Sequence, residues 1–297
     1  MTNWVDRINH VFDPVYSIGS RLPDLILRIF APLDNLARAG APEWLMNVLS
    51  IVMFGGWSIT YLLIILKSRR DKSYGIPFTN TCLNFSWELT FAFDLMGGLP
   101  AFWFPLRLGH LFWLVPNSAN AYYTWKYAPG LQRSKWLHKN FKGIFIGTFI
   151  ICFTLMSTYH VYSNDIFGVA SSWIINLMMS WMFIKMFLDR REKVRPDGTV
   201  NGMSLPAAWW KFIGNAAGAV FCFYWWPQQF ASSLAPDHTL MHIGMTVHEP
   251  RTYGFLYVVY VVNLALDLLL IGMLRERLAE IRQNKLKPSK DYHFRLA

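Results

Sequence analysis

Two carboxylate side chains stand inside long apolar stretches of this sequence, where an ionised group is costly. Glu88 lies within NFSWELTF and Asp267 within VVNLALDLLL. A charged side chain at the centre of a membrane-spanning helix costs about 2.5 to 3.5 kcal/mol on insertion scales, so such a residue is a candidate for function. A buried carboxyl that lacks a basic partner takes up a proton at neutral pH. The two residues therefore predict acid chemistry in a dry site.

The nearby basic residues are expected to leave these two carboxyls unpaired. Lys185, Lys211 and Arg107 lie near the ends of their apolar stretches. Long basic side chains in that position extend toward the membrane surface and keep their charge in water. We therefore expect no Lys or Arg at the depth of the two carboxyls.

Several amide side chains lie at a similar depth. Asn84 precedes Glu88 by four residues and Asn263 precedes Asp267 by four, so each pair shares a helix face. An amide in a spanning helix can also serve only to bond two helices together, and either role fits a single Asn. Two carboxyls and several amides at one depth nevertheless predict a polar, substrate-binding layer. The other amides of this layer are Asn117, Asn120, Asn176 and Asn215.

Aromatic side chains are placed to form the wall of that layer. Phe91 lies about one turn from the glutamate, Tyr260 about two turns from the aspartate, and Trp87 directly before the glutamate. The face of an aromatic ring attracts cations. We predict that these three rings contact the substrate. Trp225 and Trp226, near the outer end of their stretch, are instead expected in an interfacial belt.

The elements that must position these residues are long helices. Of the 297 residues, 54% are apolar and 15% are charged, against about 25% charged in soluble domains. The apolar residues gather into stretches of about twenty, the length of a helix that crosses a bilayer. The sequence therefore predicts an all-α polytopic membrane protein, a seven-transmembrane-helix bundle, and argues against a solvated globular enzyme. The predicted spans are 45–66, 78–98, 104–126, 143–163, 166–188, 207–232 and 253–274.

The distribution of basic residues orients these helices. Lys and Arg total 28 against 18 Asp and Glu, a net charge of +10, and cytoplasmic loops retain such an excess. Basic residues cluster in 67–72, 126–142, 185–195 and the tail from 275. In the long loop 233–252, Arg251 is the only Lys or Arg residue. This alternation predicts a cytoplasmic C-terminus and a non-cytoplasmic N-terminus, and it accounts for the net charge without a nucleic-acid partner.

Three regions follow from this pattern. Residues 1–44 form an N-terminal amphipathic segment with an interfacial helix within 22–39, residues 45–274 form the seven-helix domain, and residues 275–297 form a basic cytoplasmic tail. The three cysteines match no disulfide or metal-binding spacing, so we predict that they pack in the interior. They are Cys82, Cys152 and Cys222.

The phrase NFSWELTF, with Asn84, Trp87 and Glu88, together with Asn263 and Asp267, resembles the small integral-membrane terpene cyclases of meroterpenoid biosynthesis, the pyripyropene-cyclase type. The resemblance covers about residues 45 to 274. It implies a seven-helix enzyme that cyclises a prenyl chain attached to an aromatic or indole head group. It also implies that Glu88 and Asp267 are the two essential acids of the site.

The chemistry of the residues agrees with this resemblance. Protonation of a terminal epoxide or alkene needs a desolvated carboxylic acid, and the resulting carbocation needs a dry cavity. No metal or other cofactor is expected, because ionisation of a diphosphate would need an aspartate-rich Mg²⁺ site and no DDxxD-like pair lies within a span. The expected partners are a farnesyl- or geranylgeranyl-substituted aromatic or indole and the lipid bilayer.

One alternative of another class remains, a proton-coupled transporter of small solutes. Pro227 and Gln228 match the PQ dipeptide of seven-helix carriers, and membrane carboxylates also serve proton coupling. Such carriers are built from paired repeats. The second PQ is absent here, and the two acids lie in the second and seventh predicted helices, so we favour the cyclase.

Overall fold

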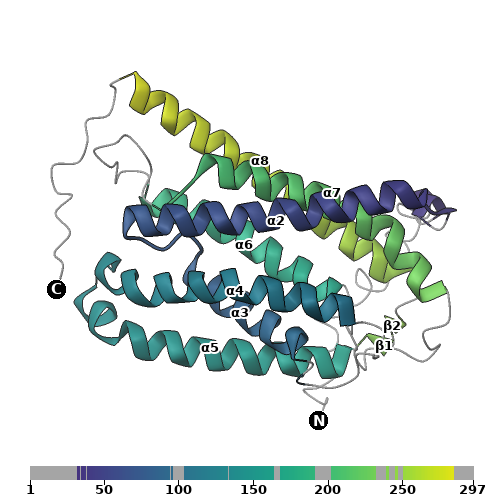
Figure 1. Ribbon diagram of the computed structural model, residues 1–297, viewed down its shortest axis with the longest axis horizontal. Coiled ribbons are helices and arrows are strands. Elements are labelled where there is room, and N and C mark those ends of the chain that lie inside the picture. Colours follow the sequence, from purple (N-terminus) through teal and green to yellow (C-terminus); the bar gives the residue numbers. More distant parts are fainter. Residues whose placement is uncertain are drawn as a thin grey trace, which may run out of the picture.

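The computed structural model shows an elongated bundle of helices that run side by side (Figure 1). It describes residues 32–33, 35–37, 39–93, 95, 104–132, 134–163, 168–190, 202–231, 239–240, 245–246 and 250–283. The helices are α2 (Glu43–Asp71), α3 (Phe78–Ala92), α4 (Phe104–Tyr127), α5 (Lys135–Ser163), α6 (Val169–Arg190), α7 (Leu205–Ala231) and α8 (Pro250–Arg282), with a 3-10 turn at Pro129–Leu131. Two short strands, β1 (Thr239–Leu240) and β2 (Met245–Thr246), pair antiparallel.

Each predicted span overlaps one of these helices, but several boundaries differ. The helix α5 begins at Lys135, earlier than the predicted 143, and α8 runs from Pro250 to Arg282, well beyond 253–274. The described part of α3 ends at Ala92 rather than 98, shortly before the sequence GGLP, whose Gly and Pro residues disfavour a helix. The small hairpin of β1 and β2 lies in a loop for which no strand was predicted. Apolar length located the helices, while their ends depend on local turns.

Four helices of the described part are long and apolar enough to cross a membrane. They are α2, α5, α6 and α8. The described α3 has only 15 residues, and α4 and α7 carry polar side chains, among them Asn117 and Lys211, that are buried within the bundle. The structure therefore supports a helical membrane protein, and the count of seven spans stays a prediction. The predicted interfacial helix within 22–39 falls mostly outside the described residues.

The bundle places apolar side chains outside and polar ones inside. Trp44, Ile51, Val115 and Val261 are each exposed by 67% or more, whereas Asn80, Asn215 and other amides are buried. Lipid tails solvate the exposed apolar side chains as well as a protein core does. The three cysteines are free and buried, as predicted.

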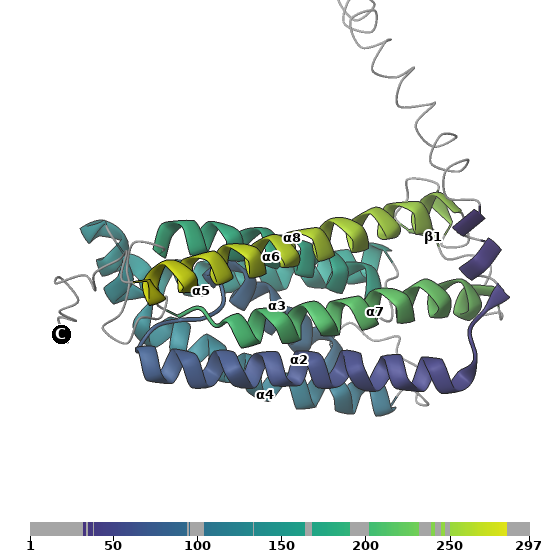
Figure 2. The same ribbon diagram turned by 90° about the horizontal axis from the view of Figure 1, so that it is seen from above.

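Close packing between α2 and α7 holds one side of the bundle together (Figure 2). Gly56 faces Gly214, and a Cβ atom added to Gly56 would lie 2.7 Å from the Gly214 Cα. Gly214 and Gly218 are spaced as in the GxxxG motif that lets helices approach closely in membranes. The other neighbouring helices are α3 against α4, α5 and α6, α2 against α4, and α8 against α6 and α7.

Candidate active site

A cavity of about 370 Å³ lies between α2, α3, α4, α6 and α7. This volume is within the range of about 300 to 1,000 Å³ that is typical of small-molecule sites. Its aromatic lining residues include Trp57, Tyr61, Trp87, Trp113, Trp173, Phe221 and Trp225. Its polar lining residues are Asn84, Glu88, His110, Ser172, Asn176 and Asn215. The cavity thus combines an aromatic wall with a few polar groups.

Glu88 is the carboxylate of this cavity, and its closest partner is a histidine. The residue is 2% exposed, and its Oε2 atom lies 2.9 Å from His110 Nδ1. Asn117 Nδ2 lies 3.4 Å from Oε1. The rings of Trp87 and Phe91 pack against the imidazole, with centroid distances of 4.6 and 5.3 Å. The acid group is therefore held between α3 and α4.

His110 was missing from the predicted site. Its only signal in the sequence was that it lowered the hydrophobicity of an otherwise apolar stretch. A titratable residue inside a spanning helix deserves the same attention whether it is acidic or basic. That rule would have identified His110.

The polar residues beside Glu88 fix the other side of the cavity. Asn84 Nδ2 donates a hydrogen bond to Tyr61 Oη at 3.3 Å. Trp87 Nε1 donates to Ser171 Oγ at 3.0 Å, which fixes the orientation of the indole. Three of the predicted site residues, Asn84, Trp87 and Glu88, thus meet at one wall.

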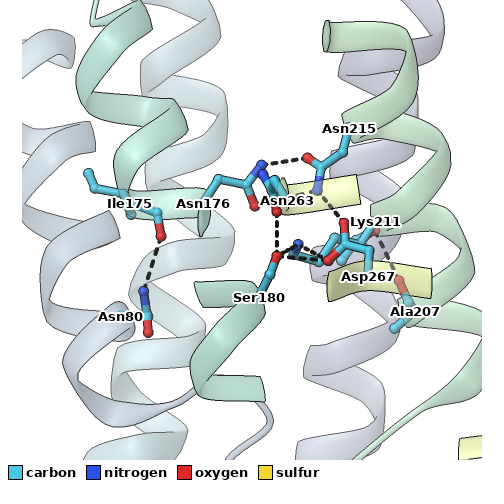
Figure 3. Close-up of polar contacts among 10 residues, drawn as sticks. Asn80, Ile175, Asn176, Ser180, Ala207, Lys211, Asn215, Asn263 and Asp267 are labelled. Atoms are coloured by element: carbon cyan, nitrogen blue, oxygen red, sulfur yellow. Dashed lines mark hydrogen bonds and ion pairs between the residues drawn. The ribbon is translucent and has the colours of Figure 1, made fainter. Parts of the chain in front are cut away.

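Asp267 lies in a second polar cluster, and it has a basic partner (Figure 3). Lys211 Nζ is 2.6 Å from Asp267 Oδ1, and both side chains are 2% to 3% exposed. The expectation of no basic group at this depth, and of a Lys211 side chain that extends to the surface, was wrong. Lys211 lies only six residues into α7, but it points toward α8, where the carboxylate compensates its charge. Sequence depth could not reveal that direction.

Amides connect this cluster to the cavity. Asn215 Nδ2 donates to Asp267 Oδ2 at 2.6 Å, and Asn176 Nδ2 donates to Asn215 Oδ1 at 2.6 Å. Asn176 and Asn215 line the cavity, whereas Asp267 is not among its described lining residues. Glu88 therefore lines the cavity, whereas Asp267 lies behind Asn215.

The remaining predicted amides are buried away from the cavity. Asn263 Oδ1 lies 2.5 Å from Ser180 Oγ, in the cluster of Asp267. Asn117 Nδ2 donates a hydrogen bond to Glu88 Oε1 and is not among the described lining residues of the cavity. Asn120 is 3% exposed, and its amide has no hydrogen-bond partner among the described residues. Their role in substrate binding stays a prediction.

The aromatic wall differs from the predicted one. Phe91 stacks on His110, and Tyr260 packs against Trp173 with a centroid distance of 4.4 Å, so both rings form a second layer behind the lining residues. Trp225, predicted for an interfacial belt, lines the cavity. Helix periodicity identified the inward faces of the helices. It could not show which side chain of a neighbouring helix lies between a predicted ring and the cavity.

Comparison with known proteins decides the family. The family model of Pyr4-like transmembrane terpene cyclases matches residues 37–262. The chain belongs to the Pyr4-like transmembrane terpene cyclases. The resemblance inferred from NFSWELTF and the seventh predicted helix is thereby confirmed.

Individual relatives carry matching names. Terpene cyclase macJ of Penicillium terrestre is 26% identical over 215 residues, which cover 68% of this chain and 76% of that protein. Pyr4-family terpene cyclase mfmH of Annulohypoxylon moriforme is 25% identical over 214 residues, 68% of this chain and 80% of its own. Asnovolin H synthase nvfL of Aspergillus novofumigatus is 31% identical over 98 residues, 31% of this chain and 39% of its own. No solved structure matches the chain.

The site suits a membrane terpene cyclase of this family. Terpene cyclisation passes through carbocations, which a dry cavity protects from water and which aromatic faces stabilise. The lining residues supply the aromatic faces, and Glu88 is the one carboxyl among the described lining residues. The transporter alternative finds no support among these relatives.

Proposed function

We propose that this Pyr4-like cyclase protonates the terminal epoxide or alkene of a prenylated aromatic or indole, and that Glu88 is the proton donor. The observation that carries the proposal is the different placement of the two acids. Glu88 lines the aromatic cavity, whereas Asp267 lies behind Asn215 and is paired with Lys211. A carboxylate held by an ammonium has no proton to donate.

The proposed reaction is an isomerisation. The proton of Glu88 moves to the epoxide oxygen, the C–O bond to the more substituted carbon breaks, and the alkene π electrons form successive ring bonds. The last cation loses a proton, and Glu88, the one carboxylate among the described lining residues, can take it back. No metal enters this sequence, because protonation generates the cation.

An epoxide suits this acid better than an alkene. The Glu88 carboxyl, whose Oε2 lies 2.9 Å from His110 Nδ1, is a weak acid for protonation of an alkene. An epoxide oxygen accepts a proton on a lone pair and its ring strain assists opening, whereas an alkene must be protonated at carbon. We expect the epoxide of a farnesyl or geranylgeranyl chain to be the preferred form.

The proposal extends to organisation and placement. Residues 45–274 would form the catalytic domain, between an N-terminal interfacial segment and a basic tail. The excess of Lys and Arg at 67–72, 126–142, 185–195 and from 275 onward supports a cytoplasmic location of these segments and of the C-terminus.

The test is the activity of Glu88→Gln in membranes given a panel of prenylated aromatics and indoles with and without a terminal epoxide, with products identified by mass spectrometry and NMR. Loss of a general acid should reduce turnover by at least about 100-fold. The matched control is Asp189→Asn, since Asp189 is exposed and pairs with Lys185 at the end of α6. The control should keep the parent rate. A Glu88→Gln enzyme that turns over at the parent rate would refute the acid role.

A further inference from the structure

The buried ion pair of Lys211 and Asp267 is not explained by proton donation. Lys211 Nζ lies 2.6 Å from Asp267 Oδ1 and 2.6 Å from Ser180 Oγ (Figure 3). It also lies 5.6 Å from the ring centroid of Trp57. Within the described residues, Lys211 is the one Lys or Arg that forms an ion pair with Asp267. Removal of one partner from a buried pair leaves the other charge uncompensated.

We propose that Lys211 is a positioning residue that keeps Asp267 ionised, and that the Asp267 carboxylate fixes the direction of the amide dipoles of Asn215 and Asn176, two lining residues whose dipoles act on cations in the cavity. The inference rests on the proposed function, because the direction of these dipoles matters only if a cationic intermediate forms there. It gives the second acid of the site an electrostatic role.

The hydrogen bonds determine the direction of both amides. An ionised carboxylate only accepts, so Asn215 must turn its NH₂ group toward Asp267 Oδ2, at 2.6 Å. Asn215 Oδ1 then points toward Asn176 and accepts from its Nδ2 at 2.6 Å. Asn215 Nδ2 also donates a longer hydrogen bond to Asn176 Oδ1, at 3.4 Å, so the two amides pair with each other. The charge on Asp267 is thus transmitted to two lining residues.

A protonated Asp267 would remove this constraint. Its O–H group could donate to Asn215 Oδ1, and both amides could then reverse the direction of their dipoles. The oxygen end of an amide dipole attracts a carbocation and the N–H end repels it, so this reversal would change the field in the cavity. Lys211 prevents the reversal because it stabilises the ionised form of Asp267 at a depth where water cannot.

The direct test is Lys211→Met, because methionine has a volume similar to that of lysine but carries no charge. Lys185→Met is the control, since Lys185 is 70% exposed and pairs only with Asp189 in the described structure. Infrared difference spectra of the purified enzyme should show one additional protonated-carboxyl band in Lys211→Met. The band should be absent from Lys185→Met and should disappear in Lys211→Met/Asp267→Asn. A Lys211→Met enzyme without the additional band would overturn the proposal.

The double variant separates positioning from folding. Lys211→Met/Asp267→Asn removes both buried charges and should melt closer to the parent than Lys211→Met does. It should still show a kcat at least about tenfold lower and an altered product ratio, with a smaller change in KM, because the amides are no longer oriented. A well-folded double variant with the parent kcat and product ratio would mean that the pair is structural only. The activity of Glu88→Gln tests the proton-donor role of Glu88 whatever the result for the Lys211 variants, so the two proposals can fail separately.

Discussion

The two buried carboxyls have different surroundings, which is why we propose different roles for them. Glu88 has an imidazole and an amide as partners and opens onto the cavity. Asp267 has an ammonium, a hydroxyl and an amide, and is covered by Asn215. Acid and base assignments in enzymes commonly follow such contrasts.

Replacement of His110 by Phe tests the partner of Glu88. Phe keeps an aromatic ring between Trp87 and Phe91 but removes the 2.9 Å contact to the carboxyl. We expect kcat to fall about 10- to 100-fold with little change in KM, because the proton donor loses its orientation. Steady-state kinetics in membranes would measure this. His138→Phe, at an exposed histidine that bonds the Pro129 carbonyl, is the control and should keep the parent kcat. Equal kcat in both variants would contradict the prediction.

Trp173 rather than Tyr260 should guide the cations. Trp173 lines the cavity, while Tyr260 lies behind it. A ring that faces a cation contributes about 0.5 to 2 kcal/mol, which shifts the choice among cations more than it stops initiation. We expect Trp173→Leu to change the ratio of cyclised products, and folded Tyr260→Leu to keep the parent ratio. The measurement is the product profile from equal amounts of each folded enzyme. A parent product ratio in Trp173→Leu with an altered ratio in Tyr260→Leu would assign the guiding role to Tyr260 instead.

At the scale of elements, the contact between α2 and α7 depends on two glycines. A methyl group on Gly56 would lie 2.7 Å from the backbone of Gly214, so the helices would have to separate. Gly56→Ala should therefore destabilise the bundle by about 1 to 3 kcal/mol, the usual cost of overpacking. Thermal unfolding in detergent would show a lower Tm.

The adjacent Gly55 is a close control for this prediction. A Cβ atom at Gly55 meets nothing within 4 Å, and alanine favours a helix more than glycine does. Gly55→Ala should keep or slightly raise the Tm. Indistinguishable melting of the two variants would show that the close approach of α2 and α7 is not required.

For the whole molecule, the alternating charge of the connections predicts its orientation in the membrane. Glu43→Cys and Arg69→Cys place exposed thiols at opposite ends of α2. We expect a membrane-impermeant maleimide to label position 69 from the cytoplasmic side and position 43 from the other side. The native cysteines Cys82, Cys152 and Cys222 are buried and should contribute little background. Reversed labelling would contradict the proposed topology.

The sequence alone was sufficient for the helical character, the buried acids and the family. These features depend on local properties of the chain, namely apolar length, helix periodicity and the spacing of Asn84, Trp87 and Glu88. Such properties can be recognised without knowing which helices pack together. The two acids were recognisable because a carboxylate in an apolar stretch is costly wherever the helix packs.

The partners of those acids were decided only by the tertiary structure. Whether Lys211 extends to the surface or turns to Asp267 depends on the rotation of α7 against α8, and neither helix specifies that rotation by itself. The same holds for His110, which meets Glu88 across α3 and α4, and for Trp173, which covers Tyr260. Contacts between helices depend on axial rotation and on the close approach that residues such as Gly56 allow, so the assembled bundle determines which buried acid faces the cavity.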